Sequence, residues 1–179
     1  GASCSEGLLA MVAAEAAAEG KSVDEVEALV RDLIPKARVF GIADDLKYAV
    51  KGGRVPSWVY KLTRALHINP VLTASPEGKV GPGGVHIGRG ANPKRLAKTL
   101  VKNMAPDTMY RVLISHANNE EAARAVRHQV LANHGRIHSC HVTDARPALG
   151  VHVGPGGLFA GFVPQPDTLN RTSSRVRDK

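Results

Sequence analysis

The stretch Val71-Leu72-Thr73-Ala74-Ser75-Pro76-Glu77-Gly78-Lys79-Val80 decides the fold class. Two short runs with apolar residues, at its start and its end, flank a Ser-Pro-Glu-Gly segment whose proline and glycine favour a tight turn. The pattern predicts a β-hairpin, in which the two strands run antiparallel. Helices and strands alternate elsewhere, so a hairpin in mid-chain argues against a purely parallel sheet. We expect a mixed α/β domain with a sheet flanked by helices.

On the N-terminal side of the hairpin, two capping boxes predict two helices: Ser3 with Glu6, and Ser22 with Glu25. In each pair the side chains satisfy backbone amides that a helix start leaves free. We expect the first helix over residues 5–19 and the second from residue 23 to near Pro35, where apolar residues recur at helical spacing.

Apolar periodicity and helix-breaking residues predict the remaining elements. In chain order we expect a strand over Arg38–Ile42, a short helix capped by Asp44 or Asp45 that ends at Gly52-Gly53, a helix after Pro56 that carries an apolar stripe, and a Gly-rich link over Gly81–Gly90. We then expect a helix over Pro93–Met104, a strand over Tyr110–Ser115, and a helix from Asn118 to Gly135 with Val126, Val130 and Leu131 on one face. A strand over Arg136–Thr143, short apolar runs around a tight turn over Ala145–Pro164, and a closing strand over Leu158–Val163 follow. Residues 1–166 are expected to form one domain and residues 167–179 a basic disordered tail.

Composition narrows the classes of function. The chain has 179 residues and a formal net charge of +8, but its basic residues are spread over many segments and few aromatic residues accompany them. Nucleic-acid binding uses clustered basic residues and stacking aromatics, so we expect no nucleic-acid partner. Two distant cysteines, Cys4 and Cys140, argue against a disulfide scaffold, and no apolar stretch is long enough for a membrane span. We expect a cytoplasmic protein.

The loop Lys51-Gly52-Gly53-Arg54 is the first candidate site. Its glycines have access to backbone angles closed to other residues and expose amides beside a cation, an arrangement that suits an anion. A plain helix-breaking turn with a solvated arginine explains the same residues, and physics alone favours that simpler reading.

His152 is the second candidate, in Val151-His152-Val153-Gly154-Pro155-Gly156-Gly157. An imidazole held between apolar neighbours and a sharp turn suits a hydrogen bond to a carboxylate or phosphate. The alternative is a core histidine that bonds a backbone carbonyl.

Other chemistries find little support. The cluster His134, His138, Cys140 and His141 spreads over a helix end and both faces of a strand, so we expect no metal site. A Walker-type phosphate loop and a Gly-x-Ser-x-Gly elbow are both absent from the sequence. The adjacent Ser115 and His116 point apart in a strand, which leaves no internal catalytic pair.

Four stretches together resemble the bacterial DegV family. They are Glu6-Gly7-Leu8-Leu9, the run from Leu46 to Val55 that contains Lys51-Gly52-Gly53-Arg54, Leu66-His67-Ile68-Asn69-Pro70-Val71-Leu72, and Gly150-Val151-His152-Val153-Gly154-Pro155-Gly156. Their order and spacing agree with the family, and the resemblance spans residues 6–164. It implies the C-terminal domain of a two-domain protein, without the N-terminal domain whose hydroxyl groups share the ligand.

The resemblance implies a non-catalytic, fatty-acid-binding subunit that presents a long-chain acyl carboxylate to a separate fatty acid kinase subunit. It implies that His152 holds the carboxylate and that Gly52, Gly53 and Arg54 face the head group or the kinase. A weaker implication makes an acyl tunnel wall of Trp58, Leu62, Leu66 and Ile68. The fatty acid is the ligand, no other cofactor is expected, and transient contact with a membrane surface is compatible with this role. The alternative is a regulatory, lipid-sensing or interaction domain of a larger fusion with a kinase-like part.

Overall fold

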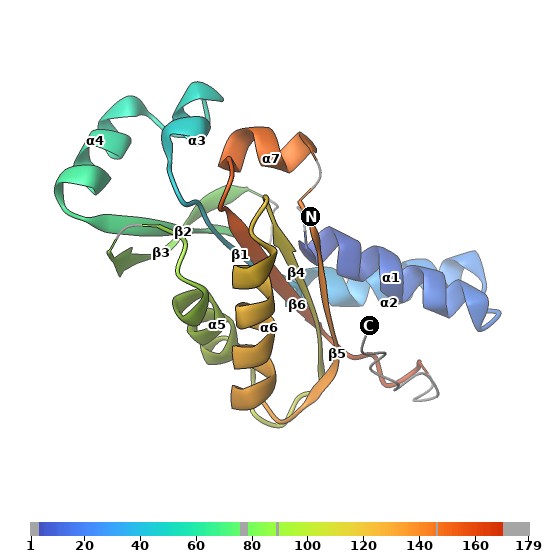
Figure 1. The fold of residues 1–179 in the computed structure, drawn as a ribbon. Helices are drawn as coiled ribbons and strands as arrows, with labels where there is room; N and C mark the ends of the chain where they lie inside the picture. The colour runs from blue at the N-terminus through green and yellow to red at the C-terminus, as the bar shows by residue number, and fades with distance from the viewer. Residues whose placement is uncertain (1–3, 76–78, 89, 146, 170–179) are drawn as a thin grey trace.

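The computed structural model describes residues 4–75, 79–88, 90–145 and 147–169. In chain order its elements are α1 (Cys4–Ala18), α2 (Val23–Leu33), a 3-10 turn η1 (Ile34–Lys36), β1 (Arg38–Ile42), α3 (Lys47–Lys51), α4 (Ser57–Ala65), β2 (Ile68–Ala74), β3 (Val80–Ile87), α5 (Pro93–Lys102), β4 (Tyr110–His116), α6 (Glu120–Asn133), β5 (Ile137–Asp144), α7 (Pro147–Val153) and β6 (Leu158–Pro164). Figure 1 shows helices on both faces of a central sheet.

The sheet is mixed, as the hairpin predicted. Its six strands follow the order β3-β2-β1-β6-β4-β5. Only the β4–β5 pair is parallel among these neighbours, and the other pairs are antiparallel. The last strand, β6, lies inside the sheet between β1 and β4, and six of its seven residues are buried. Helices cover both faces of the sheet at β6, which explains why its sequence is apolar without alternation.

The hairpin itself is longer than expected. β2 pairs with β3 from Ile68–Ile87 to Ala74–Val80, and the Ser75 amide donates to the Lys79 carbonyl at 2.8 Å. The expectation of a Gly-rich link over Gly81–Gly90 is wrong, because β3 occupies most of it. Pairing with β2 uses backbone groups, so glycines that lack side chains still form a strand here.

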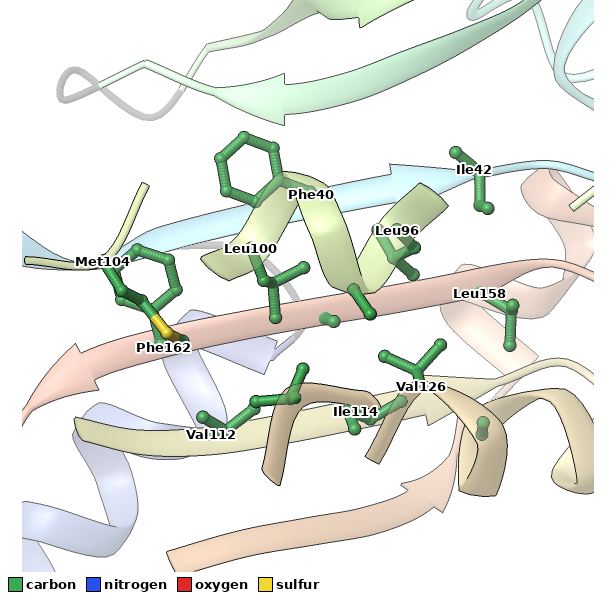
Figure 2. Packing of buried hydrophobic residues seen from close by; sticks show 14 of the residues in the cluster. Phe40, Ile42, Leu96, Leu100, Met104, Val112, Ile114, Val126, Leu158 and Phe162 are labelled. Carbon is green, nitrogen blue, oxygen red and sulfur yellow. The ribbon is translucent and has the colours of Figure 1, made fainter. Parts of the chain in front are cut away.

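The main core lies between the sheet and the helices α5 and α6. Leu96 and Leu100 of α5 and Val126 of α6 are buried against β-strand residues such as Ile114 and Phe162. Figure 2 shows these side chains meeting above the strands. Val126 and Val130 are buried but Leu131 is 41% exposed, so its predicted place on the same face of α6 is wrong.

The opposite face of the sheet is covered by α1, with α3, α4 and α7 at one end (Figure 1). Arg111 of β4 is 2% exposed beneath α1. Its Nη2 atom lies 2.6 Å from Oε2 of Glu15, and its Nε atom donates to Gln165. The buried guanidinium thus ties α1 to the sheet, because its charge is compensated by Glu15.

Capping explains part of the helix boundaries. The second capping box is confirmed: the Glu25 amide donates to Oγ of Ser22 at 3.3 Å, and the Ser22 amide donates to Oε2 of Glu25 at 2.8 Å. Ser3 of the first box lies outside the described residues. Asp45 accepts from the Lys47 amide at 2.9 Å near the start of α3, whereas Asp44 accepts from the Ala91 amide and does not cap this helix.

The end of the described chain packs against the first two helices. Leu169 is buried with Val12, Ala16 and Leu33. Leu169 belongs to the segment 167–179 that was expected to be a disordered tail. Residues 170–179 of that expected tail lie outside the described part. Within the described ranges, no helix has the length and apolar content needed to span a bilayer.

Candidate functional site

The segment that holds the candidate histidine forms a helix followed by a sharp turn. His152 lies in α7, a helix that was not expected there. Pro147 suits the first turn of a helix, but Gly150 and the two valines have low helix propensity, so the sequence gives little helical signal. The turn follows at Gly154.

Gly154 and Gly156 are two positions of this turn where only glycine fits. Gly154 has a φ of +72° and Gly156 a φ of +87°. A Cβ at Gly154 would lie 2.1 Å from Cδ2 of Tyr48, and a Cβ at Gly156 would lie 2.7 Å from Cβ of Asp44. Both the backbone angles and the close neighbours therefore exclude larger residues. These contacts bring α3 and the preceding loop to the turn.

Hydrogen bonds hold the turn against the end of β4. The Gly156 amide donates to the Ala117 carbonyl at 2.7 Å, and the Ala117 amide donates to the Gly157 carbonyl at 2.9 Å. Nδ2 of Asn119 donates to the Gly156 carbonyl at 2.9 Å. Asn119 is the N-cap residue of α6 but makes no side-chain cap bond, because its amide serves the turn instead.

The two candidate stretches meet although they are about a hundred residues apart. A Cβ at Gly52 would lie 2.5 Å from Nδ1 of His152, so the imidazole packs directly over the backbone that ends α3. His152 is half-buried. Its Nδ1 atom is buried and has no hydrogen-bond partner within the described residues. A buried polar atom without a partner costs about 1–3 kcal/mol, so its retention calls for an explanation.

Arg54 lies at the same loop. Its Nη1 atom donates to the Gly52 carbonyl at 3.2 Å, and the side chain is exposed. Gly53 has a φ of +69°, and a Cβ there would meet open space. The loop therefore places the exposed guanidinium of Arg54 next to Gly52, against which the imidazole of His152 packs, with open space beside Gly53.

The apolar stripe predicted for the helix after Pro56 lies on the exposed side of α4. Trp58 is 64% exposed, Leu62 and Leu66 are also exposed, and the buried residue of this helix is Thr63. Periodicity locates an apolar face but does not say what covers it.

Ile68 separates from the other three tunnel candidates. It begins β2 and lines a hollow of about 220 Å³ under α4. The hollow is lined by Asp44, Asp45, Leu46, Tyr60, Thr63, Arg64, Ile68, Asn69 and Gly90. Most of these side chains are polar, so the hollow by itself is not an alkyl-chain slot.

Exposed apolar side chains occur on the hairpin as well as on α4, and Figure 1 shows α4 at the end of the sheet that holds β2 and β3. Ile87 pairs with Ile68, and Val85 pairs with Pro70. Paired residues of neighbouring strands share a face of the sheet, and both Ile87 and Val85 are exposed. The hairpin thus presents an open apolar strip that was not expected from its glycine-rich sequence.

The other titratable candidates have structural neighbours. His134 lies 3.2 Å from the Ala105 carbonyl through Nε2, and burial raises the pKa of Cys140 to about 12. Oγ of Ser115 lies 3.4 Å from Sγ of Cys4, whereas Nδ1 of His116 accepts from the Asn119 amide at 3.3 Å. Ser115 and His116 therefore have different partners. In the described part of the chain, no group of three or more His, Cys, Asp or Glu side chains is placed to hold a metal ion.

Comparison with known proteins shows the family of the chain and the likeness of its fold. The sequence model of a protein family, described as uncharacterised proteins of the DegV family, matches residues 2–164. A DegV domain-containing protein of Streptococcus pyogenes is 31% identical over 160 residues, which cover 89% of this chain and 54% of that protein. The chain thus spans about half the length of the curated relatives that it matches.

Two solved structures show the same fold. A DegV family protein from Thermus thermophilus, described by its fatty acid binding, has a TM-score of 0.74 and 24% identity, with 89% of this chain and 56% of that chain covered. A DegV family protein from Ruminococcus gnavus, solved with vaccenic acid, has a TM-score of 0.73 and 21% identity, with 87% and 55% covered.

Proposed function

Because this chain belongs to the DegV family, we propose that it binds a long-chain fatty acid and that His152 holds the acyl carboxylate. The fatty acids named for the two structural relatives support the ligand class. The match covers 55% and 56% of these two relatives, so the proposal concerns the part of the binding site that this chain supplies.

The buried Nδ1 atom of His152 carries the proposal. An ionised carboxylate that leaves water needs hydrogen-bond donors in fixed positions. The imidazole is fixed by Gly52 behind it and by the turn after it, and Nδ1 has no partner in the described protein. A ligand carboxylate beside it would accept a hydrogen bond when that nitrogen carries a proton. The exposed guanidinium of Arg54 adds positive charge at the same loop.

The apolar part of the ligand needs a surface of its own. Burying an alkyl chain contributes about 0.8 kcal/mol for each methylene. We propose that Trp58, Leu62 and Leu66 of α4, together with Ile68, form one wall of that acyl slot. Their support is the exposure of Trp58, Leu62 and Leu66 to solvent, because an acyl chain would cover such apolar side chains.

We further propose that the chain is not itself an enzyme and presents the carboxylate to a separate fatty acid kinase. Arg54 and the open backbone at Gly53 are accessible to such a partner. Gly52, in contrast, has its role in positioning His152. A transient contact with a membrane surface during ligand exchange belongs to the same proposal.

Native mass spectrometry of the intact protein tests the ligand. We expect a co-purified long-chain acyl group, and a consistently empty protein would count against fatty acid binding. His152→Ala should weaken fatty acid affinity about 10- to 150-fold, the equivalent of one hydrogen bond to a charged group. His128→Ala, an exposed histidine on α6, is the matched control and should bind normally.

A phosphate-transfer assay with a fatty acid kinase tests the presentation step. Arg54→Ala should slow transfer more than it weakens binding. If no kinase uses the bound acyl chain although binding is intact, the alternative role as a lipid-sensing domain replaces the presentation role.

A further inference from the structure

We propose that α2 is a self-association surface, on which α2 of a second copy of this chain docks antiparallel. The feature that calls for an explanation is an exposed apolar stripe. Val23 is 81% exposed and Ile34, one residue past the end of α2, is 46% exposed. Val30, which lies between them on the same side of the helix, is half-buried.

The stripe lies beside the face that α2 uses inside the domain, and Val26 belongs to both, since it packs with the α1 cluster and lines the open side. Leu33 is buried and Leu29 packs with it against Val12 and Ala16 of α1. Val23, Val30 and Ile34 are spaced by seven and four residues and lie on one side of the helix, and Glu27 occupies the remaining position of this a/d-type spacing at the edge of the stripe. The helix therefore has one apolar face for α1 and a second one without a cover in the described part of the chain.

A hollow lies beside this second face. Its volume is about 540 Å³, and Ala17 and Lys21 at the end of α1 form its other side. Apolar side chains from a neighbouring helix would enter this hollow and remove both surfaces from water.

Charge favours a second copy as the occupant. Glu27 and Arg31 border the stripe on the side away from α1, both are exposed, and they form an ion pair of 2.7 Å. In an antiparallel two-fold pair, side chains on the same border meet each other. If the axis passes between Ala28 and Leu29, then Val23 lies opposite Ile34 of the second copy. Glu27 then lies opposite Arg31 of the second copy, and the symmetry makes this ion pair twice.

The contact is short, so the association is weak. An eleven-residue helix spans about 16 Å and buries less than the roughly 1,600 Å² of a standard interface. Sedimentation of the intact protein over a series of concentrations should therefore show a reversible monomer–dimer equilibrium at high micromolar concentration.

Two sets of variants locate the interface. Val30→Glu places two like charges near the axis and should raise the dimer dissociation constant at least about tenfold. Ala28→Glu is the matched control, because Ala28 is exposed on the opposite side of α2, and it should leave the equilibrium unchanged. Arg31→Glu should also weaken the dimer, and the double variant E27R/R31E should restore it.

If Val30→Glu does not fold, the variants at Glu27 and Arg31 still test the proposal, since the side chains of both residues are exposed. A chain that remains monomeric at every concentration overturns the proposal. A dimer that Val30→Glu and Arg31→Glu leave unchanged uses another face and overturns it equally.

Discussion

Substitution of Gly52 by alanine separates the position of His152 from the stability of the fold. Gly52 has a φ of −81° and a ψ of 4°, values that alanine adopts without strain. The added Cβ, however, would lie 2.5 Å from Nδ1 of His152. The ring must therefore move, while the backbone that carries the substitution keeps its conformation.

The expected effect is on binding and not on folding. Loss of one hydrogen bond to a charged carboxylate costs about 1.5–3 kcal/mol, which corresponds to a 10- to 150-fold weaker fatty acid affinity. The free energy of unfolding should change by less than about 1 kcal/mol, because alanine also lowers the entropy of the unfolded chain. Isothermal titration with a long-chain fatty acid and urea denaturation of the intact protein measure the two quantities.

Gly53→Ala is the matched control. Its φ of +69° makes alanine strained by about 1–2 kcal/mol, yet the new Cβ would touch nothing within 4 Å. This variant should lose stability and keep its fatty acid affinity. If Gly52→Ala binds as tightly as the unaltered protein, the imidazole at that position does not hold the carboxylate.

Two further predictions concern stability. Gly154→Ala combines a left-handed backbone angle with a Cβ 2.1 Å from Tyr48, and it should lower the free energy of unfolding by about 2–5 kcal/mol in urea denaturation; a loss below 1 kcal/mol would show that Tyr48 moves away freely. Glu15→Gln should cost about 1 kcal/mol at neutral pH, since the Glu15 carboxylate is partly exposed. The hydrogen bond from Arg111 holds the pKa of Glu15 below its ordinary 4.5. This contribution is therefore complete above pH 4.5 and lost as the pH falls through the folded-state pKa. The denaturation curves of Glu15→Gln and of the unaltered protein should therefore converge at acid pH. A difference between them that persists there would contradict the ion-pair explanation.

Local patterns predicted most of the regular elements. Arg38–Ile42 is a strand with the predicted bounds, and the Ser22–Glu25 box begins a helix, because both depend on neighbours in sequence. The hairpin also gave the mixed character of the sheet. The helix α7 escaped notice because its seven residues hold too few apolar repeats for periodicity to register.

The site was less predictable than the elements. His152 and Gly52 were each identified alone, and physics left each with a simpler explanation. Their contact depends on the packing of α3 against α7, and no pattern within either segment specifies it. The apolar stripe of α4 was predicted from its spacing, but that it is open to solvent was not, because periodicity is the same for a buried face and an open one.

By itself the sequence determined the helices and strands, the antiparallel hairpin and the family resemblance, since these reside in short-range spacing and in motif order. Only the tertiary structure decided that β6 lies inside the sheet, that the imidazole of His152 packs on Gly52, and that α2 and α4 keep apolar faces open. The physical reason is that burial and pairing are set by distant segments, whose contacts leave no periodic trace in the local sequence.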